Sequence, residues 1–402
     1  MKSFSVNLAV VGRFHYHNYA RLLWEQGALR RIYYSHRFDR RILPAGADSE
    51  VNLWRKEYLL RLHAKLLGDR APWMIPRYIA LWEAGVLRRW EHADLWHVLL
   101  HGAAPRILDR ARREGSRTLG EPVNAHPRDI ERLLKEEEER LGLPKRTYFR
   151  KEWRNILEEV DRSDYLLASS RWVRRSFAAH GYPEERILTC PYGVDLARFR
   201  PTPAAERDDI FRVLCVGQIC PRKGQVDLLE AWKRLQLPQA ELLLLGVIDQ
   251  GMTPVLRQYA GRFRYLGCCP SEQVASFYAP ASVFVLPSIE DGFSVVCGEA
   301  MASGLPVITT ENNGAADLIE PGINGYVVPI RSPEKIAEAL ETLYRKPDLR
   351  RAMGENALRK ARECLGWDRY VRLLMARYAE VLGVTPRETG GAVGAEVQRG
   401  EV

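Results

Sequence analysis

Residues 286–318 read LPSIEDGFSVVCGEAMASGLPVITTENNGAADL. An apolar run over 283–286 ends at a proline and a serine, and the acidic pair at 290–291 follows, next to a glycine. Glu299 opens a helix-like run, and 306–310 is a second strand-like run that leads into a polar loop. The order is therefore strand, tight loop, helix, strand and loop. In open α/β sheets, ligands bind at the carboxyl ends of the strands, where such loops gather.

The rest of the chain has an ordinary globular composition. It has 402 residues, of which 46% are hydrophobic and 28% charged, and this length is sufficient for two domains with sizeable cores. No apolar run approaches the roughly 20 residues that cross a bilayer. The N-terminus reads as a strand that ends at Gly12 and not as a signal peptide. Seven cysteines without a C-x-x-C pair predict reduced, structural thiols and a cytoplasmic protein, although the vicinal pair Cys268-Cys269 leaves a redox or metal site open.

Positive charge is concentrated in the first half of the chain. Residues 1–200 contain 37 Lys and Arg against 26 Asp and Glu, whereas residues 201–402 contain 23 against 25. Such an excess favours an anionic partner: a nucleic acid, a membrane surface or an anionic substrate. Ordinary solvated helices are the alternative. The segment 53–92 is helical by its period and combines tryptophans and tyrosines with arginines, which fits either a membrane surface or aromatic packing between helices.

Strand-like and helix-like segments alternate in two series. The first series runs from 5–11 to 187–190, and the second begins at 211–217 and ends with helices at 333–345 and 366–382. Residues 196–209 contain two prolines and no hydrophobic period, which is typical of a domain linker. We therefore expect an α/β fold of two doubly wound, Rossmann-like domains that face a cleft.

A second loop carries charges at the end of a predicted strand. It reads Gly217-Gln218-Ile219-Cys220-Pro221-Arg222-Lys223-Gly224 and precedes a predicted helix. Arg222 and Lys223 would lie beside the helix N-terminus, whose N–H groups and dipole attract anions. The pattern predicts a phosphate or diphosphate site, and the alternative is a polar loop with two solvated cations. The carboxylates of Asp291 and Glu299 suit the paired hydroxyls of ribose and sugars.

Together these loops resemble the family 4 glycosyltransferases of the GT-B fold. That family carries a Glu-x7-Glu motif within a stretch such as PS…EGFG…EAMA.G.PV, which stands here as residues 287–307 with Asp291 in the first position. The sequence PYGVD at 191–195 resembles the stretch that precedes the family's linker. The resemblance is specific over about 165–345 and weaker over 1–164.

One departure concerns the phosphate loop. The arginine and lysine of the family, spaced five apart, fall on Gln218 and Lys223. The arginine is therefore missing, and Arg222 is the cation that can supply its charge. Together with Asp291 in place of glutamate, this departure affects the identity of the donor sugar more than the class of reaction.

The resemblance implies a retaining glycosyltransferase that uses a UDP-, GDP- or ADP-linked sugar as co-substrate, with no bound cofactor and no metal. Glu299 is expected to bind ribose and Asp291 the donor sugar, while Lys223 and Arg222 neutralise the leaving diphosphate. The candidate catalytic residues are His126, Asp291 and Lys223. The candidate donor-binding residues are Gly12, Gln218, Arg222, Lys223, Gly267, Cys269, Asp291, Gly292, Phe293, Ser294, Val295 and Glu299.

The same resemblance assigns roles to the domains. Residues 1–200 are expected to bind the acceptor and residues 201–365 the nucleotide-sugar. Residues 366–384 would form a crossover helix that packs back on the first domain, and 385–402 a disordered tail. The acceptor is unidentified, with a membrane-linked molecule or a polysaccharide as candidates. The basic and aromatic composition of the first half, and not the resemblance, raises the hypothesis of a peripheral contact with an anionic membrane at its inner face.

Three other functions remain open at this point. A nucleotide-sugar hydrolase or epimerase of the same fold would consume the donor without an acceptor. A basic nucleic-acid-binding protein would use the first half of the chain, but no nucleic-acid-reading motif accompanies the charge, so no nucleic-acid partner is expected. A catalytically inactive scaffold would keep the fold and lose donor binding.

Overall fold

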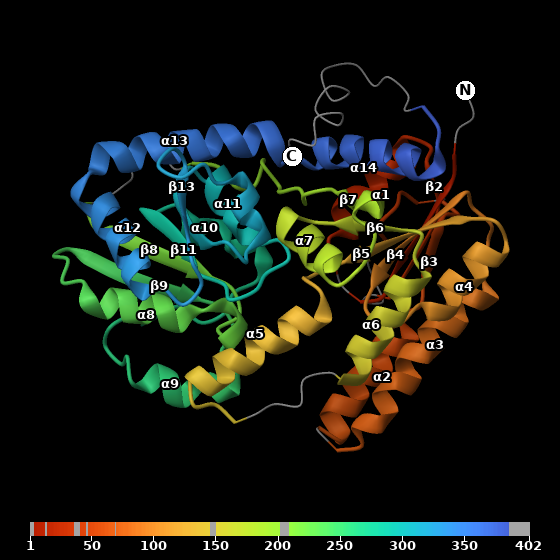
Figure 1. Ribbon diagram of the computed structural model, residues 1–402, viewed down its shortest axis with the longest axis horizontal. Coiled ribbons are helices and arrows are strands. Elements are labelled where there is room, and N and C mark those ends of the chain that lie inside the picture. Colours follow the sequence, from red (N-terminus) through yellow and green to blue (C-terminus); the bar gives the residue numbers. More distant parts are fainter. Residues whose placement is uncertain are drawn as a thin grey trace.

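The protein contains two parallel β-sheets, each covered by helices, that lie side by side (Figure 1). The computed structural model describes residues 4–12, 14–35, 41–45, 47–68, 70–144, 150–201 and 209–385. The predicted α/β fold of two doubly wound domains is therefore confirmed. Half of the predicted linker, at 202–208, and nearly all of the predicted tail, at 386–402, lie outside the described residues.

The N-terminal sheet has the strand order β3-β2-β1-β4-β5-β6-β7, and all its pairings are parallel. Its strands are β1 (Val6–Val10), β2 (Leu29–Tyr34), β3 (Glu50–Asn52), β4 (Leu95–Leu100), β5 (Arg117–Pro122), β6 (Tyr165–Ala168) and β7 (Ile187–Thr189). The α-helices of this half are α1 (Tyr16–Glu25), α2 (Arg55–Leu66), α3 (Ile75–Arg88), α4 (Pro105–Arg113), α5 (Pro127–Arg140), α6 (Arg150–Arg162) and α7 (Arg171–Ala179). The strand order reverses between β1 and β4, so the loops after these two strands border a crevice at the sheet edge.

The C-terminal sheet has the order β10-β9-β8-β11-β12-β13, again with parallel pairings. Its strands are β8 (Phe211–Val216), β9 (Ala240–Leu245), β10 (Arg264–Tyr265), β11 (Val283–Leu286), β12 (Val307–Thr310) and β13 (Gly325–Val328). The α-helices are α8 (Gln225–Arg234), α9 (Thr253–Arg257), α10 (Ala275–Tyr278), α11 (Val295–Ala302), α12 (Pro333–Arg345), α13 (Pro347–Cys364) and α14 (Trp367–Leu382). Here the order reverses between β8 and β11, which brings the two motif-bearing loops to one place.

Burial explains why the strands read as apolar runs. All five residues of β1 and all four of β11 are buried, because helices cover both faces of a parallel sheet. All seven cysteines are free thiols, and Cys190, Cys215, Cys220 and Cys297 are buried. Buried thiols act as small hydrophobic groups, in agreement with the prediction of structural cysteines.

The last helix returns to the first domain, as predicted. The blue helix α14 lies over the N-terminal sheet beside α1, whereas α13 runs along the other domain (Figure 1). The hydroxyl of Tyr378 lies 2.8 Å from Nδ1 of the buried His97 on β4, and Arg377 Nε donates to Thr189 O over 3.1 Å. Two connections thus join the domains, the linker after β7 and the α13–α14 junction.

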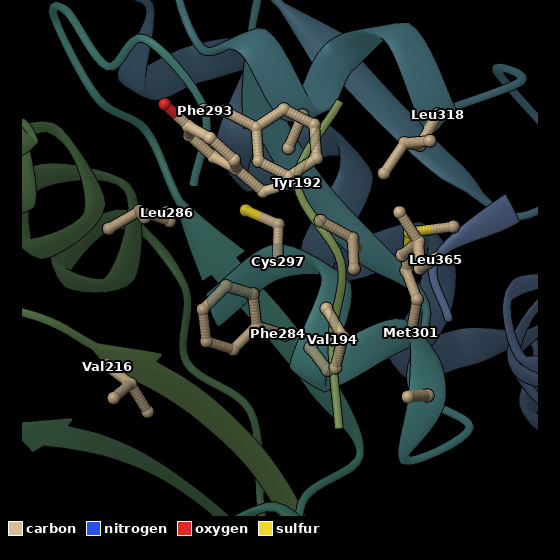
Figure 2. Packing of buried hydrophobic residues seen from close by; sticks show 14 of the residues in the cluster. Tyr192, Val194, Val216, Phe284, Leu286, Phe293, Cys297, Met301, Leu318 and Leu365 are labelled. Atoms are coloured by element: carbon tan, nitrogen blue, oxygen red, sulfur yellow. The ribbon is translucent and has the colours of Figure 1, made fainter. Parts of the chain in front are cut away.

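These two connections touch each other. Val194 N donates to Leu365 O over 2.6 Å, and both side chains pack in one apolar cluster with Cys297 and Met301 of α11 (Figure 2). A Cβ on Gly193 would lie 2.7 Å from the ring of Trp367, so only glycine allows the two segments to pass this closely. The domain limits at 200 and 365 remain a prediction, but this is the place where the chain crosses twice.

Several elements differ from the sequence expectations. The helix expected over 53–92 is divided into α2 and α3, joined through the 3-10 turn η1 (Pro72–Met74). The hydrophobic pattern also predicts helices over 252–260 and 271–278, and the structure has only the shorter helices α9 and α10 there. The expectations omitted α13 and the strands β2, β3 and β13.

Candidate active site

The two loops at the β8–β11 switch point meet directly. Arg222 and Lys223 lie on the 3-10 turn η4 (Pro221–Lys223), immediately before α8. Gly224 follows with φ +65°, and a Cβ there would lie 2.0 Å from Pro287 O. Glycine is therefore required both by the left-handed backbone and by the close approach of the loop after β11.

The cations of the first loop face the acidic pair of the second. Lys223 forms an ion pair with Asp291, and Arg222 Nη1 lies 3.3 Å from Glu290 Oε2 and 3.8 Å from Asp291 Oδ1. Burial by itself raises the pKa of Asp291, but Lys223 and Arg222 lower it more, so that its pKa lies below the usual value. Asp291 is therefore ionised at neutral pH, and two cations and two carboxylates share one buried corner.

Glu290 is a residue whose role the sequence interpretation missed. Its side chain is fully buried, and Oε1 accepts a hydrogen bond from Ala125 N of the other domain over 3.0 Å while Oε2 faces Arg222. Burial raises the pKa of Glu290 above its usual value, even though Arg222 acts to lower it. The available signal was the adjacency of two acids in this loop, of which the sequence interpretation assigned a role only to Asp291. Glu290 holds Arg222 and joins the two domains.

The loop at Asp291 is fixed by its neighbours on the next strand. Asp291 N donates to Asn312 O over 2.9 Å, and Asp291 O accepts from Gly314 N over 2.9 Å. Ser294 precedes α11 and is buried, and Val295 is the first residue of that helix. The N–H groups of a first helical turn have no acceptor within the helix, so this turn offers donors to an anion or a sugar oxygen beside Asp291.

Glu299 lies one turn further along α11. Its Oε2 accepts from the hydroxyl of the buried Tyr278 over 3.0 Å. Burial raises the pKa of Glu299 to about 7, even though the Tyr278 hydrogen bond and Arg198 act to lower it. A carboxylate with one hydroxyl donor keeps acceptor capacity for the paired hydroxyls of a ribose.

Gly292 and Phe293 lie against the N-terminal domain. Gly292 O accepts hydrogen bonds from the hydroxyls of Ser169 and Ser170, over 3.1 and 2.7 Å. A Cβ on Gly292 would lie 2.1 Å from Val123 O. The ring of Phe293 packs edge-on against Tyr192, with centroids 5.7 Å apart (Figure 2). Sequence reasoning could not find these contacts, because they join segments about 100 residues apart or more.

The remaining donor-side candidates frame the neighbouring strand ends. Gln218 is exposed, and its backbone carbonyl accepts from Gln225 Nε2 over 2.9 Å. Gly267 has φ +75°, and its carbonyl accepts from Gly246 N over 2.7 Å. Cys269 is half-buried in the same loop after β10. Gln218 lies after the carboxyl end of β8, and Gly267 and Cys269 lie after that of β10, at the same edge of the sheet as the charged corner.

The N-terminal candidates lie in two different places. Gly12 follows β1, has φ +90° and donates its N–H to the hydroxyl of Ser35 over 2.9 Å. His126 is buried at the start of α5, where Nδ1 accepts from Arg128 N over 3.3 Å and the ring stacks on His180. Burial, with His180 beside it, lowers the pKa of His126 to about 4. This ring is therefore neutral at physiological pH and caps the helix, and its catalytic role stays a prediction.

Two further histidines follow β1 and β4, the strands at which the order of this sheet reverses. His15 packs against Tyr192 and Trp367, and burial lowers its pKa to about 4. His101 directly follows β4. Between them on β5, Glu121 is buried with Oε2 2.9 Å from His97 Nε2. This side of the protein therefore offers neutral imidazoles and a carboxylate to a ligand.

The described part of the chain contains neither a metal cluster nor a membrane span. No group of three or more His, Cys, Asp or Glu side chains in these residues is arranged to hold a metal ion. Within the same residues, every helix is too short or too polar to cross a membrane.

Comparison with known proteins agrees with this geometry. Residues 200–360 match the family model of the glycosyl transferases group 1. The GDP-mannose-dependent alpha-(1-6)-phosphatidylinositol monomannoside mannosyltransferase of Mycobacterium tuberculosis is 29% identical over 225 residues, which cover 50% of this chain and 58% of that protein. The D-inositol 3-phosphate glycosyltransferase of Streptomyces bingchenggensis is 30% identical over 247 residues, with 56% and 54% covered. The matched region thus spans about half the length of these curated relatives.

Solved structures match along nearly the whole chain. The sucrose-phosphate synthase of Thermosynechococcus elongatus superposes with a TM-score of 0.70 at 18% identity, covering 94% of this chain and 99% of that one. Anabaena HepE in complex with UDP gives a TM-score of 0.64 at 16% identity, covering 94% and 100%. At such identities the likeness concerns the fold, which is GT-B.

Proposed function

We propose that this chain, which has the GT-B fold and matches the group 1 glycosyl transferases over residues 200–360, is a member of that family and transfers a sugar from a nucleotide-diphosphate sugar to an acceptor. The transfer retains the anomeric configuration and needs no metal ion. The donor lies at the carboxyl ends of β8 and β11, and the acceptor approaches from the N-terminal domain.

The observation that carries this proposal is the charged corner of Arg222, Lys223, Glu290 and Asp291. The Lys223–Asp291 ion pair occupies the place where a diphosphate and a sugar would meet. On donor binding, Lys223 moves from Asp291 to the diphosphate, and Asp291 becomes free to accept hydrogen bonds from sugar hydroxyls. Two cations close to the leaving diphosphate stabilise the charge that develops on it, and so they lower the barrier to transfer.

The other candidate residues complete the donor site. Glu299 accepts the ribose hydroxyls, the first turn of α11 offers N–H groups from Ser294 and Val295, and the loop with Gly267 and Cys269 borders the base. The position of the family's arginine is occupied by Gln218 in this chain. Arg222 supplies the missing positive charge, because Glu290 holds the Arg222 guanidinium beside Asp291. The segment 123–126 packs on Gly292 through Val123 and Asn124, and this contact keeps His126 near the proposed donor site.

The identity of the donor follows from a binding panel. Relatives are named for GDP-mannose and structural neighbours for UDP and UDP-glucose, so the panel contains GDP-, UDP- and ADP-linked sugars. A ligand that binds only the folded protein raises its melting temperature by mass action. We expect one nucleotide class to raise the melting temperature of the wild-type protein and Lys223→Ala to abolish that rise. In a separate activity assay, we expect the wild-type protein to keep its activity when EDTA is added.

Turnover measured with and without an acceptor, together with the binding panel, separates the alternatives. A hydrolase or epimerase releases nucleotide or converts the sugar at full rate without any acceptor, whereas a transferase is stimulated by acceptor. A scaffold that has lost activity gives no shift with any donor. Absence of stabilisation by all three nucleotide classes, or an unchanged shift in Lys223→Ala, would overturn the proposal.

A further inference from the structure

The helical hairpin of α2, η1 and α3 carries an unusual surface. It projects from the N-terminal sheet on the side opposite α14, at the bottom of the view (Figure 1). Ten large hydrophobic residues are exposed in the described part of the chain, and five of them fall within this hairpin. They are Tyr58 at 50% exposure, Leu62 at 38%, Leu66 at 66%, Trp73 at 61% and Leu81 at 49%. Apolar side chains gathered this densely on a surface mark an interaction site.

The arrangement of these side chains forms a continuous strip on α2. Tyr58, Leu62 and Leu66 are spaced four apart, so they lie above one another on one face of the helix. Exposed cations flank them, namely Arg55, Arg61 and Lys65. The strip is therefore apolar along its axis and basic along its edges.

The turn and α3 repeat this combination. Arg77 is exposed and lies over the ring of Trp73, 4.7 Å from its centroid, and Leu81 follows one turn later. Arg70 adds a further exposed cation. The hairpin includes no exposed acidic side chain among its described residues, and Glu57 is half-buried. The exposed apolar and basic residues of 55–81 together form the hairpin surface.

The rest of the hairpin's aromatic content is packed inside. Trp82 is buried, and Trp90, just beyond the end of α3, stacks on Trp96 with centroids 4.0 Å apart. Packing between elements therefore explains part of the aromatic content of 53–92, and it does not explain the exposure of Tyr58 or Trp73. An aromatic ring with a polar edge, beside leucines and arginines, suits the boundary between lipid headgroups and acyl chains.

We propose that the hairpin surface docks on an anionic lipid bilayer. Leucines and aromatic rings would enter the headgroup region, while the cations pair with lipid phosphates. A second copy of this chain would bring the same cations against each other, which opposes pairing of two hairpins. A nucleic acid would use the cations but leave Leu62, Leu66 and Leu81 without a function.

The base of the hairpin connects this surface to the crevice of the N-terminal domain. Lys56 and Glu57 in the first turn of α2 form an ion pair, and Glu57 accepts from the hydroxyl of Ser35, which itself accepts from Gly12 N. His101 after β4 lies close enough to Lys56 for that cation to lower its pKa, although desolvation has the larger effect. Docking would therefore place the β1–β4 crevice close to the membrane.

The test measures binding of the full chain to vesicles without any nucleotide-sugar, so its outcome does not depend on the proposed donor chemistry. Flotation is compared for vesicles of neutral phosphatidylcholine and vesicles with about 30% phosphatidylglycerol. We expect binding to the anionic vesicles at low salt and a strong decrease at high salt, because salt screens the contribution of the cations. Absence of binding to anionic vesicles at low salt would overturn the docking proposal.

Matched variants locate the surface. Arg61→Ser/Lys65→Ser should lower partitioning about 20-fold, since each interfacial cation contributes about fivefold, and Leu66→Ser/Trp73→Ser should lower it further. The controls are Arg257→Ser/Arg359→Ser, which remove equal charge from the C-terminal domain, and Ile210→Ser/Ile323→Ser, which replace exposed apolar residues there. Equal losses in the hairpin variants and the controls would contradict the proposal, as would a hairpin-dependent dimer or hairpin-dependent binding of duplex DNA without vesicle binding.

Discussion

At the scale of single residues, Glu299 is a carboxyl group that changes its protonation state near neutral pH. Burial raises its pKa to about 7, so the folded protein carries an unfavourable charge there once the pH exceeds this value. For an acid whose pKa is raised in the fold, stability is lost as the pH rises from its ordinary value, near 4.5, through about 7. A ribose that donates hydrogen bonds to the carboxylate would compensate this cost in the complex.

Glu299→Gln should therefore change stability and binding in opposite directions. The amide keeps an acceptor for the Tyr278 hydroxyl and removes the buried charge, so the melting temperature should rise at pH 8 and change little at pH 5. Loss of a charge-assisted hydrogen bond should weaken donor binding by about 2 kcal/mol, or roughly 30-fold in Kd. Thermal denaturation at the two pH values and titration calorimetry with the donor provide the check; tight donor binding by the variant would contradict the ribose role.

Glu290 gives a prediction of a different kind, because it acts between domains. In Glu290→Ala the buried N–H of Ala125 loses its acceptor, and the guanidinium of Arg222 keeps only the backbone carbonyl of residue 290 and Asp291 as partners. Unpaired buried groups of this type cost about 2 kcal/mol, which denaturant titration would detect. Glu290→Gln keeps the acceptor for Ala125 and should recover most of the stability but not the placement of Arg222. Equal stability of wild type and Glu290→Ala would show that the contact is dispensable.

At the scale of elements, the orange helix α5 extends from the N-terminal domain to the C-terminal one (Figure 1). Arg140 at its end makes two hydrogen bonds to Asp227 on α8, over 2.8 and 3.1 Å, and two to Glu137. Arg331 of the C-terminal domain reaches back to Glu136 and Glu137, over 2.9 and 3.1 Å. The side chains of Glu137 and Asp227 are almost fully buried, so this network fastens the two domains opposite the α13–α14 junction.

Arg140→Ala should destabilise the protein because it leaves Asp227 as a buried carboxylate without its cation. We expect a loss of about 3 kcal/mol, the range for breaking a buried pair from one side. Arg132→Ala on the same helix is the control: its side chain is 56% exposed and pairs with Glu136 on the surface, so its effect should stay within about 0.5 kcal/mol. Similar effects of the two substitutions, measured by denaturant titration, would mean that α5 does not fasten the domains.

The elements also show which parts of the fold could be predicted from the sequence. Long apolar strands such as β8 and β11, and helices that follow a glycine or serine, were predictable because burial imposes a simple pattern. Strand β2 was missed since Arg30 and Arg31 interrupt its apolar run, and α13 since its polar residues mask the period. In the site, Asp291, Lys223 and Glu299 could be placed from loops at strand ends. The partners Ala125, Ser169 and Ser170 could not, because the contact between domains depends on tertiary structure.

At the scale of the whole molecule, the relative position of the domains is determined by a few close contacts. The two crossings at Val194 and Leu365 allow rotation only within the limits of their shared apolar cluster. On the other side, the loop after β11 touches the loop after β5 with no space for a side chain at Gly292. The residues proposed to bind the donor and the loops of the N-terminal domain therefore meet only when the domains are this close.

Gly292→Ala tests this dependence. The added Cβ would lie 2.1 Å from Val123 O and 2.8 Å from Asn124 Cα, and both are backbone atoms that cannot move aside alone. The domains should separate, which small-angle scattering would record as a larger radius of gyration, and kcat/KM should fall about 100-fold because the reacting groups lose their alignment. Gly366→Ala is the control, since its Cβ would meet only Leu196 at 3.6 Å. A variant at position 292 with the wild-type radius and wild-type turnover would show that catalysis does not require the close contact between the domains.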